Sequence, residues 1–228
     1  RNLFRGTGNV VPRPYPATCQ AWGLNISKGI SGKAQLKNLI ENHAAFPEEL
    51  RESLVDMITH AQTTQKVLNK ITKTLEVLAK NDKVCQLIQT IPGLGTICSC
   101  RLRATIGDIK RFKNPKDFPA YYGLVPRSIA TGHNEKKGKI THRGDRTMRS
   151  LMVQGAGCVI RLATCGKLKS KQLTKWILKK QKEKMPWGKL VCAVAAKLLR
   201  IVRAILISSK PYNPKIAGVA KCSLSKGS

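Results

Sequence analysis

Residues 82–112 read DKVCQLIQTIPGLGTICSCRLRATIGDIKRF, and their pattern indicates the fold class. Apolar residues recur at helical spacing up to Ile91, where Pro92 is expected to end the helix. After a short turn, Thr96 can cap a second helix. The stretch therefore predicts two helices joined by a tight connection.

The connection itself, Pro92–Gly95 (PGLG), favours a helix-hairpin-helix element. Gly93 and Gly95 would let the backbone come close to a phosphate, and the free N–H groups of the following helix would point at it. A plain tight turn between two packed helices is the alternative. The basic residues nearby favour the phosphate-binding interpretation.

Upstream, apolar residues recur with a period of 3.5 from Leu50 to Leu78, broken in character only at Thr64. Such a period over four heptads is typical of a coiled coil, so we expect the chain to form homo-oligomers through this segment. A long amphipathic helix packed on its own domain is the alternative, because Ala61 and Thr64 weaken the seam, the row of apolar heptad positions through which two helices would pack.

Downstream, helical signals dominate and strand signals are few. DRTMRSLMVQGAGCVIRLAT, which begins at Asp145, predicts an amphipathic helix, and KLKSKQLTKWILKKQKEK predicts a basic one. Residues 190–207 read as an apolar core helix with Lys197, Arg200 and Arg203 as a basic stripe. The predicted fold is mostly α: a long coiled-coil helix followed by a compact helical domain with a helix-hairpin-helix element. The expected parts are an irregular segment at 1–33, a coiled-coil helical hairpin at 34–83, the helical domain at 84–212 and a disordered basic tail at 213–228.

Charge is unevenly distributed along the 228 residues, whose formal net charge is +30. Residues 1–90 hold 12 Lys and Arg against 7 Asp and Glu, whereas residues 91–228 hold 30 against 5. A compact domain with that excess repels itself unless a polyanion is usually nearby. Nucleic acid is the leading partner and an anionic membrane surface the weaker one.

The densest basic stretch is IATGHNEKKGKITHRGDR, residues 129–146, with seven basic or histidine side chains in eighteen positions. We expect a loop that clamps a nucleic-acid backbone, and a solvated charged loop without a partner is the alternative.

The sequence gives little indication of a membrane span, a disulfide framework or a metal site. No run of about 18 apolar residues is free of charge, so no membrane span is expected. The eight cysteines lack zinc-site spacing, and their scattered positions favour reduced, buried thiols over a disulfide framework. The five acidic residues after residue 90 sit singly beside Lys or Arg, so no metal site is expected; Asp145 can instead cap the helix that follows it.

The order of TIPGLG, IGDIKRFKNPKDFPAYYGLVPR, ATG and GKITHRGDRTMRSLMVQGA resembles the C-terminal transposase domain of the IS110 family. These are the DEDD transposases and Piv-type DNA invertases of bacterial insertion sequences. The resemblance spans roughly residues 84–212, and the heptad segment looks like the coiled coil that links the two halves of such enzymes. It implies a RuvC-like domain whose Asp/Glu/Asp/Asp set binds Mg²⁺, and a serine in the C-terminal domain that attacks DNA covalently. The implied partners are DNA and a structured guide RNA, in the bacterial cytoplasm close to the nucleoid.

In this chain, GLVPRSIATG places Thr131 at the position of the family's serine nucleophile, before Gly132. A threonine hydroxyl can also attack, but β-branching restricts χ1 and crowds the oxygen. Ser128 lies three residues earlier, out of register with the glycine. The catalytic position implied by the resemblance is therefore Thr131.

We interpret the chain as the DNA-binding C-terminal half of a transposase, inactive alone because these residues hold no RuvC-like acidic set. Mg²⁺ is expected only with that domain, and this chain is expected to need no cofactor. A stand-alone, non-specific nucleic-acid-binding protein is the alternative, and a membrane-surface role for the C-terminal basic helix is a weaker third. The predicted nucleic-acid contacts are Gly93, Gly95, Arg127, Lys136, Lys137, Lys139, Arg143, Arg146 and Arg149.

Overall fold

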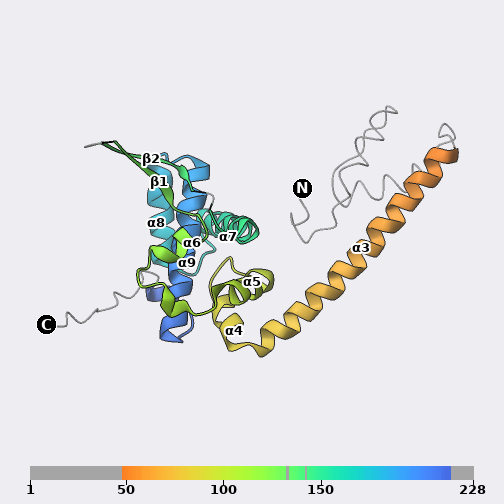
Figure 1. The fold of residues 1–228 in the computed structure, drawn as a ribbon, viewed down its shortest axis with the longest axis horizontal. Coiled ribbons are helices and arrows are strands. Elements are labelled where there is room, and N and C mark those ends of the chain that lie inside the picture. The colour runs from red at the N-terminus through yellow and green to blue at the C-terminus, as the bar shows by residue number, and fades with distance from the viewer. Residues whose placement is uncertain (1–47, 132–133, 142, 217–228) are drawn as a thin grey trace. The chain divides into compact units, whose positions relative to one another are not determined.

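The computed structural model describes residues 48–131, 134–141 and 143–216 (Figure 1). The chain divides into two compact units, residues 1–73 and 74–228. The elements, labelled as in Figure 1, are α3 (Glu48–Asn81), α4 (Lys83–Gln89), α5 (Thr96–Ile106), the 3₁₀ turn η1 (Ile109–Arg111), α6 (Asp117–Tyr121), β1 (Pro126–Thr131), β2 (Asn134–Ile140), α7 (Arg146–Thr164), α8 (Lys171–Lys182), α9 (Trp187–Ser208) and the 3₁₀ turn η2 (Pro214–Ile216). The prediction of a mostly α protein is confirmed. The segments at 1–33 and 34–47 lie outside the described residues.

The heptad segment forms one continuous helix, α3, of 34 residues. Four of its threonines fit a helix because their hydroxyls donate to the carbonyl four residues back, as Thr64 Oγ1 does to His60 O at 2.9 Å. Asp82 then starts α4: its carboxylate accepts from the amides of Val84 and Cys85 at 2.7 and 3.2 Å.

Two details of the PGLG prediction were wrong. Helix α4 ends at Gln89, with Thr90 as its C-cap, rather than continuing to Ile91. The N-cap of α5 is Gly95, which provides no side-chain cap, and Thr96 is the first helical residue.

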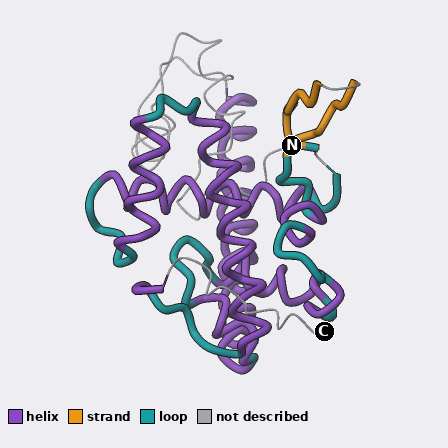
Figure 2. The backbone as a smooth tube through the Cα atoms, turned by 90° about the vertical axis from the view of Figure 1, so that its left-hand side faces the viewer, coloured by secondary structure: helices purple, strands orange, loops and turns teal. Residues whose placement is uncertain are grey.

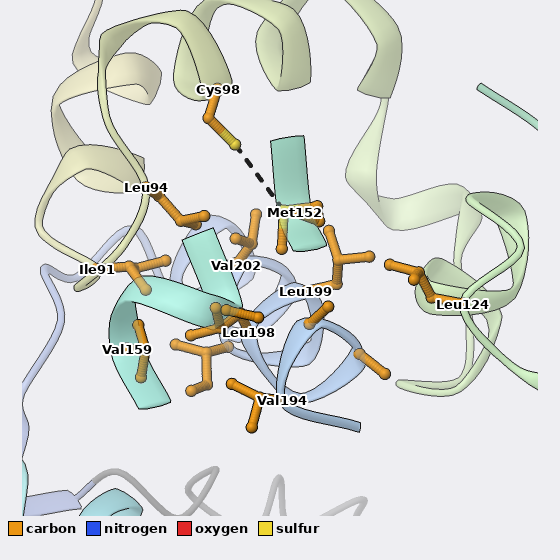
Figure 3. Packing of buried hydrophobic residues seen from close by; sticks show 14 of the residues in the cluster. Ile91, Leu94, Cys98, Leu124, Met152, Val159, Val194, Leu198, Leu199 and Val202 are labelled. Carbon is orange, nitrogen blue, oxygen red and sulfur yellow. Dashed lines mark hydrogen bonds between the residues drawn. The ribbon is translucent and has the colours of Figure 1, made fainter. Parts of the chain in front are cut away.

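One apolar core holds α4, α5, α7 and α9 together. Figure 3 shows side chains of the PGLG connection gathered with those of α7 and α9. Ile91 and Leu94 are almost fully buried there, as are Met152 and Val159 of α7. The Cys98 thiol lies 3.8 Å from the Met152 sulfur, and α9 contributes the largest share of fully buried side chains. The core is therefore helix packed on helix, as the periodicity predicted.

The stretch predicted to be a basic loop is instead mostly a two-stranded antiparallel ribbon, β1 paired with β2. Figures 1 and 2 show this ribbon extending away from the helices of its unit. Its register pairs Pro126 with Ile140 at the base and Thr131 with Asn134 at the far end, with an irregularity between Pro126 and Ser128. The loop prediction was wrong for 129–131 and 134–140.

The end of the described chain is more ordered than the sequence predicted. Residues Pro214–Ile216 form η2, and Pro214 O accepts a hydrogen bond from the hydroxyl of Ser170, the N-cap of α8, at 3.0 Å. The predicted disordered tail therefore cannot begin at 213; residues 217–228 lie outside the described part.

Candidate nucleic-acid interface

Thr131, the position at which the resemblance predicts the nucleophile, lies at the far end of the ribbon. Thr131 is the last residue of β1, and its backbone pairs with Asn134 across the short connection. Lys136 and Lys137 follow on β2, opposite Ile129 and Ser128. A β-ribbon can place a row of residues along a duplex, as strand-based DNA-binding proteins do.

Further predicted contacts lie near the ribbon's base. Arg127 of β1 and Lys139 of β2 are exposed, and so are Arg143 and Arg146 where the chain passes from β2 into α7. The structure thus brings these four cations onto the ribbon and the start of α7. Exposed Lys and Arg without a structural partner suit contacts with phosphate.

Arg149 differs from these residues, since only 9% of it is exposed. Its Nη1 donates hydrogen bonds to Tyr122 O at 3.0 Å and to Arg143 O at 2.8 Å. Those two carbonyls flank the ribbon, one before β1 and one after β2. The structure therefore disfavours Arg149 as a phosphate contact, because the guanidinium fastens the ribbon to α7.

The residues just before α7 also hold the junction between the ribbon and this helix in place. Gly144 has φ +76°, and an added Cβ would lie 2.1 Å from Tyr121 O, so a side chain cannot be accommodated without movement. Asp145 caps α7 through the amides of Thr147 and Met148, which confirms the predicted cap.

An ion pair reinforces this cap. Arg101 of α5 binds both carboxylate oxygens of Asp145, with Nε–Oδ2 at 2.8 Å and Nη2–Oδ1 at 3.0 Å. The Arg101 hydrogen bond holds the pKa of Asp145 below its usual value, although burial opposes the shift. This carboxylate therefore serves the fold and is not free to bind a metal.

An aromatic cluster supports the start of the ribbon. Tyr122 is fully buried, and its hydroxyl lies 2.8 Å from Thr105 Oγ1 of α5. Its ring meets those of Phe118 and Tyr121 edge to face, at centroid distances of 5.5 and 5.0 Å. Burial raises the pKa of Tyr122. The carbonyl that Arg149 binds is thus held rigidly.

The PGLG glycines serve packing more than ligand approach. Gly93 has φ +83°, and an added Cβ would lie 2.6 Å from Gly155 O of α7; at Gly155 an added Cβ would lie 2.4 Å from Gly93 O. The turn and the helix therefore touch backbone to backbone. Gly95 has no such neighbour, and the contact at Gly155 is about 14 Å along α7 from Arg146. The PGLG turn and the ribbon base thus meet different parts of α7.

The sequence did not reveal Arg101, Tyr122 or Gly144 as parts of this junction. A Gly-Asp pair before a helical pattern did signal the cap. Arg101 gave no signal, because its partner is 44 residues away and arginines are common on helix surfaces.

Metal-binding clusters are not found in the described part of the chain, where no group of three or more His, Cys, Asp or Glu side chains could hold an ion. Four of the five acidic residues after residue 90 are instead engaged in contacts within the fold. Asp108 caps η1, Asp117 accepts from the Asn114 amide, Asp145 pairs with Arg101, and Glu183 pairs with Lys180. The six cysteines within the described ranges are free thiols, but the prediction that they are buried holds only for Cys85 and Cys98, since Cys158 and Cys165 are exposed. None of the described helices is long and apolar enough to cross a membrane.

Comparison with known proteins agrees with the order of motifs. Residues 85–171 match the family model described as transposase IS116/IS110/IS902 family. The chain is 29% identical over 171 residues to a probable family 20 transposase of Pseudomonas aeruginosa, covering 75% of this chain and 49% of the relative. It is 31% identical over 180 residues to the transposase of insertion sequence element IS1328 of Yersinia enterocolitica, covering 79% and 52%.

A third relative is the pilin gene-inverting protein of Moraxella bovis, 28% identical over 131 residues, which cover 57% of this chain and 39% of the relative. The chain spans about half the length of both of these transposases. The family model covers α4 to the start of α8, the region that contains both the PGLG turn and the ribbon with its anchors. Residues 85–171 are thus a transposase domain, and through it the chain belongs to the IS116/IS110/IS902 family.

Proposed function

We propose that this chain is the DNA-binding C-terminal half of an insertion-sequence transposase, acting in DNA transposition near the bacterial nucleoid. The observation that carries the proposal is the basic ribbon anchored to α7. Exposed cations lie at its base and at the start of α7, while the hydrogen bonds that anchor the ribbon to α7 come from Arg149, which is buried. Phosphate contacts can therefore be made without disturbing the fold.

The ribbon would lie along the DNA backbone, with Arg127, Lys139, Arg143 and Arg146 as phosphate contacts. Lys136 and Lys137 occupy neighbouring positions on β2 and would extend this row toward Thr131. A structured guide RNA would meet the same charges, since its backbone is also a polyanion.

Cleavage is proposed to need more than these residues. A phosphate under attack requires its developing charge to be neutralised, and the resemblance assigns that role to Mg²⁺ on a RuvC-like domain. The contacts made by Asp108, Asp117, Asp145 and Glu183 support the proposal that this chain supplies no such acidic set. Thr131 holds the nucleophile position, and residues 1–228 by themselves would bind DNA without cutting it.

Self-association through α3 is part of the proposal. Two of the predicted seam residues, Ile71 and Leu78, are 51% and 58% exposed in the single chain. Large apolar side chains exposed at heptad positions are stabilised when a second helix covers them.

The test is binding of the purified chain to a duplex DNA across a salt series with Mg²⁺, followed by a denaturing gel. We expect steeply salt-dependent binding without a covalent adduct. Exchanging Lys136, Lys137 and Lys139 for Gln should reduce the slope of log K against log salt by about 3, since each phosphate contact contributes about 0.9.

The matched control exchanges three exposed α3 and α4 lysines, Lys66, Lys73 and Lys83, for Gln, with the same change in net charge. An equal effect of both variants would contradict a ribbon interface. A covalent protein–DNA band that disappears in Thr131→Ala would contradict inactivity of the chain alone, because Thr131→Ala should otherwise change nothing.

A further inference from the structure

The second lysine-rich region of the domain lies on α8 and the turns around it, outside the ribbon. Residues 167–189 contain nine lysines, and Glu183 is the only acidic residue among them. Eight of the nine lysines are exposed; the ninth, Lys180, pairs with Glu183 at 2.6 Å. The stretch therefore carries a concentrated positive charge that the proposed ribbon interface does not use.

Four of the exposed lysines form one stripe along α8: Lys171, Lys175, Lys179 and Lys182. At helical spacing these positions fall within about 80° of one another and span roughly 16 Å of the helix axis. That length corresponds to about five successive phosphates of one DNA strand, at 3.4 Å each along the duplex axis.

The opposite face of α8 holds the helix against the domain. Leu173 and Ile177 are fully buried, and the Ser170 hydroxyl caps the helix while bonding to Pro214 O. Because its apolar face is already covered, α8 cannot insert that face into a lipid surface as an interfacial helix does. The lysine stripe thus lies on a helix that is packed against the domain. The hypothesis that a basic helix binds a membrane surface loses support at α8, because no apolar face of α8 is available to enter the lipid.

A solvated helix face usually intersperses both signs of charge, and like charges four residues apart destabilise a helix by a few tenths of a kcal/mol. Here Lys171, Lys175 and Lys179 follow one another at that spacing, and none of them forms an ion pair within the described ranges, although the Glu183 carboxylate attracts Lys179 at longer range. A bound polyanion would turn this repulsion into attraction.

The flank of α8 adds two more positive charges. Lys197 Nζ of α9 lies 4.6 Å from the ring centroid of Trp176 on α8. Burial, together with the neighbouring Arg200, lowers the pKa of Lys197. Neither cation has a carboxylate partner in the described part of the chain, whereas Arg203, predicted to share their stripe, is bound to Phe112 O and Lys113 O. The positive potential thus continues from α8 onto α9.

We infer that the α8 stripe, formed by Lys171, Lys175, Lys179 and Lys182 and flanked by Lys197 and Arg200, is a second binding surface for the sugar-phosphate backbone of duplex DNA. This inference rests on the proposed DNA-binding function and deepens it by adding a contact apart from the ribbon. Lysines offer point charges and little base recognition, so the surface adds affinity without sequence preference. The Trp176 ring, the one aromatic side chain on α8, is partly buried against the core and has Lys197 over one face.

The experiment compares salt slopes for a 30-base-pair duplex of arbitrary sequence. The α8 variant carries Lys171→Gln, Lys175→Gln, Lys179→Gln and Lys182→Gln. Its control carries Lys66→Gln, Lys73→Gln, Lys80→Gln and Lys83→Gln, which removes the same charge from exposed sites outside α8. We expect the α8 variant to lower the slope by about 3 to 4 and the control by less than 1. Circular dichroism of each variant checks that the helices are retained.

The outcomes separate this inference from the proposed function. If the ribbon variant (Lys136→Gln, Lys137→Gln, Lys139→Gln) weakens binding while the α8 variant behaves like its control, the α8 surface is overturned and the DNA-binding function stands. Failure of the wild-type chain to bind duplex DNA overturns both. A loss confined to duplex RNA or to single-stranded DNA of the same sequence overturns the assignment to duplex DNA.

Discussion

Arg146 and Arg149 lie one turn apart on α7, and the fold uses them differently. Arg149 is buried with both hydrogen bonds made to backbone carbonyls, whereas Arg146 is exposed. Arg149→Ala would leave Tyr122 O and Arg143 O without their donor, and hydrogen bonds to a charged group contribute about 1.5–3 kcal/mol each. We expect the free energy of unfolding to fall by about 2–4 kcal/mol, measured by urea denaturation.

Arg146→Ala is the control for that measurement. An exposed substitution should change stability by no more than about 0.5 kcal/mol, yet it should weaken DNA binding and lower the salt slope by about 1. Equal destabilisation by the two variants would mean that Arg149 does not anchor the ribbon.

Asp145 should make stability depend on pH. Its pKa is lowered in the folded chain by the Arg101 hydrogen bond, so the carboxylate stabilises the fold above the ordinary pKa of 3.8, and this contribution is lost as pH falls through the lower, folded value. Asp145→Asn keeps a capping side chain but removes the charge. We expect the wild type to be more stable by about 1 kcal/mol or less at pH 6, because Arg101 is 40% exposed and solvent screens the pair. The difference in urea midpoint should shrink below pH 3.8; a difference that persists unchanged to pH 2 would exclude the ion pair as its cause.

At the scale of the element, the contact between the PGLG turn and α7 requires two glycines. Gly155→Ala would place a Cβ 2.4 Å from Gly93 O, which forces the turn and the helix apart. We expect a loss of about 1–3 kcal/mol in thermal or urea unfolding. Gly157→Ala, two residues along the same helix, meets nothing within 4 Å and should stabilise by up to about 1 kcal/mol through helix propensity. The opposite signs are the prediction, and similar losses at both sites would contradict it.

The α3 helix offers a test of the proposed coiled coil. Ile71 lies on the heptad seam and Val77 off it, and both are more than half exposed in the single chain. Ile71→Lys should therefore weaken self-association at least tenfold, while Val77→Lys should leave it unchanged. Sedimentation over a concentration series measures both. A monomeric wild type, or equal effects of the two changes, would refute the seam.

At the scale of the whole molecule, the net charge of +30 should govern stability in solution. Raising NaCl from about 0.01 to 0.1 M shortens the screening length from about 30 to 10 Å and reduces repulsion among the exposed cations. We expect the Tm to rise by several degrees over this range. The rise should be smaller after Lys171, Lys175, Lys179 and Lys182 are exchanged for Glu, because each exchange replaces a positive charge by a negative one and lowers the net charge by two. A Tm that is independent of salt would show that the charges are too far apart to matter.

The helices of this molecule could be predicted from sequence, because each carries an apolar stripe that the core covers. The ribbon could not: β1 and β2 read PRSIAT and NEKKGKI, in which apolar and polar residues do not alternate, so the pattern that marks a half-buried strand is absent. The sequence predicts Arg149 as a phosphate contact because it cannot show the partners of this side chain. Its acceptors are backbone carbonyls 27 and 6 residues away, and every residue type has such a carbonyl. Thr131 could be placed by family resemblance, but its role at the end of the ribbon stays a prediction.

The fastening of the ribbon has a consequence for protein engineering. An isolated two-stranded hairpin is marginally stable in water, and this one is held through Tyr122, Arg143, Gly144 and Arg149, all of which lie outside β1 and β2. The strands are therefore an exchangeable cassette, because the residues that anchor them belong to the helical part of the domain and stay in place when the strand sequence is changed. A library that randomises residues 127–139 and keeps the anchoring residues unchanged should contain many folded members. Ribbons with affinity for new ligands could be selected from it.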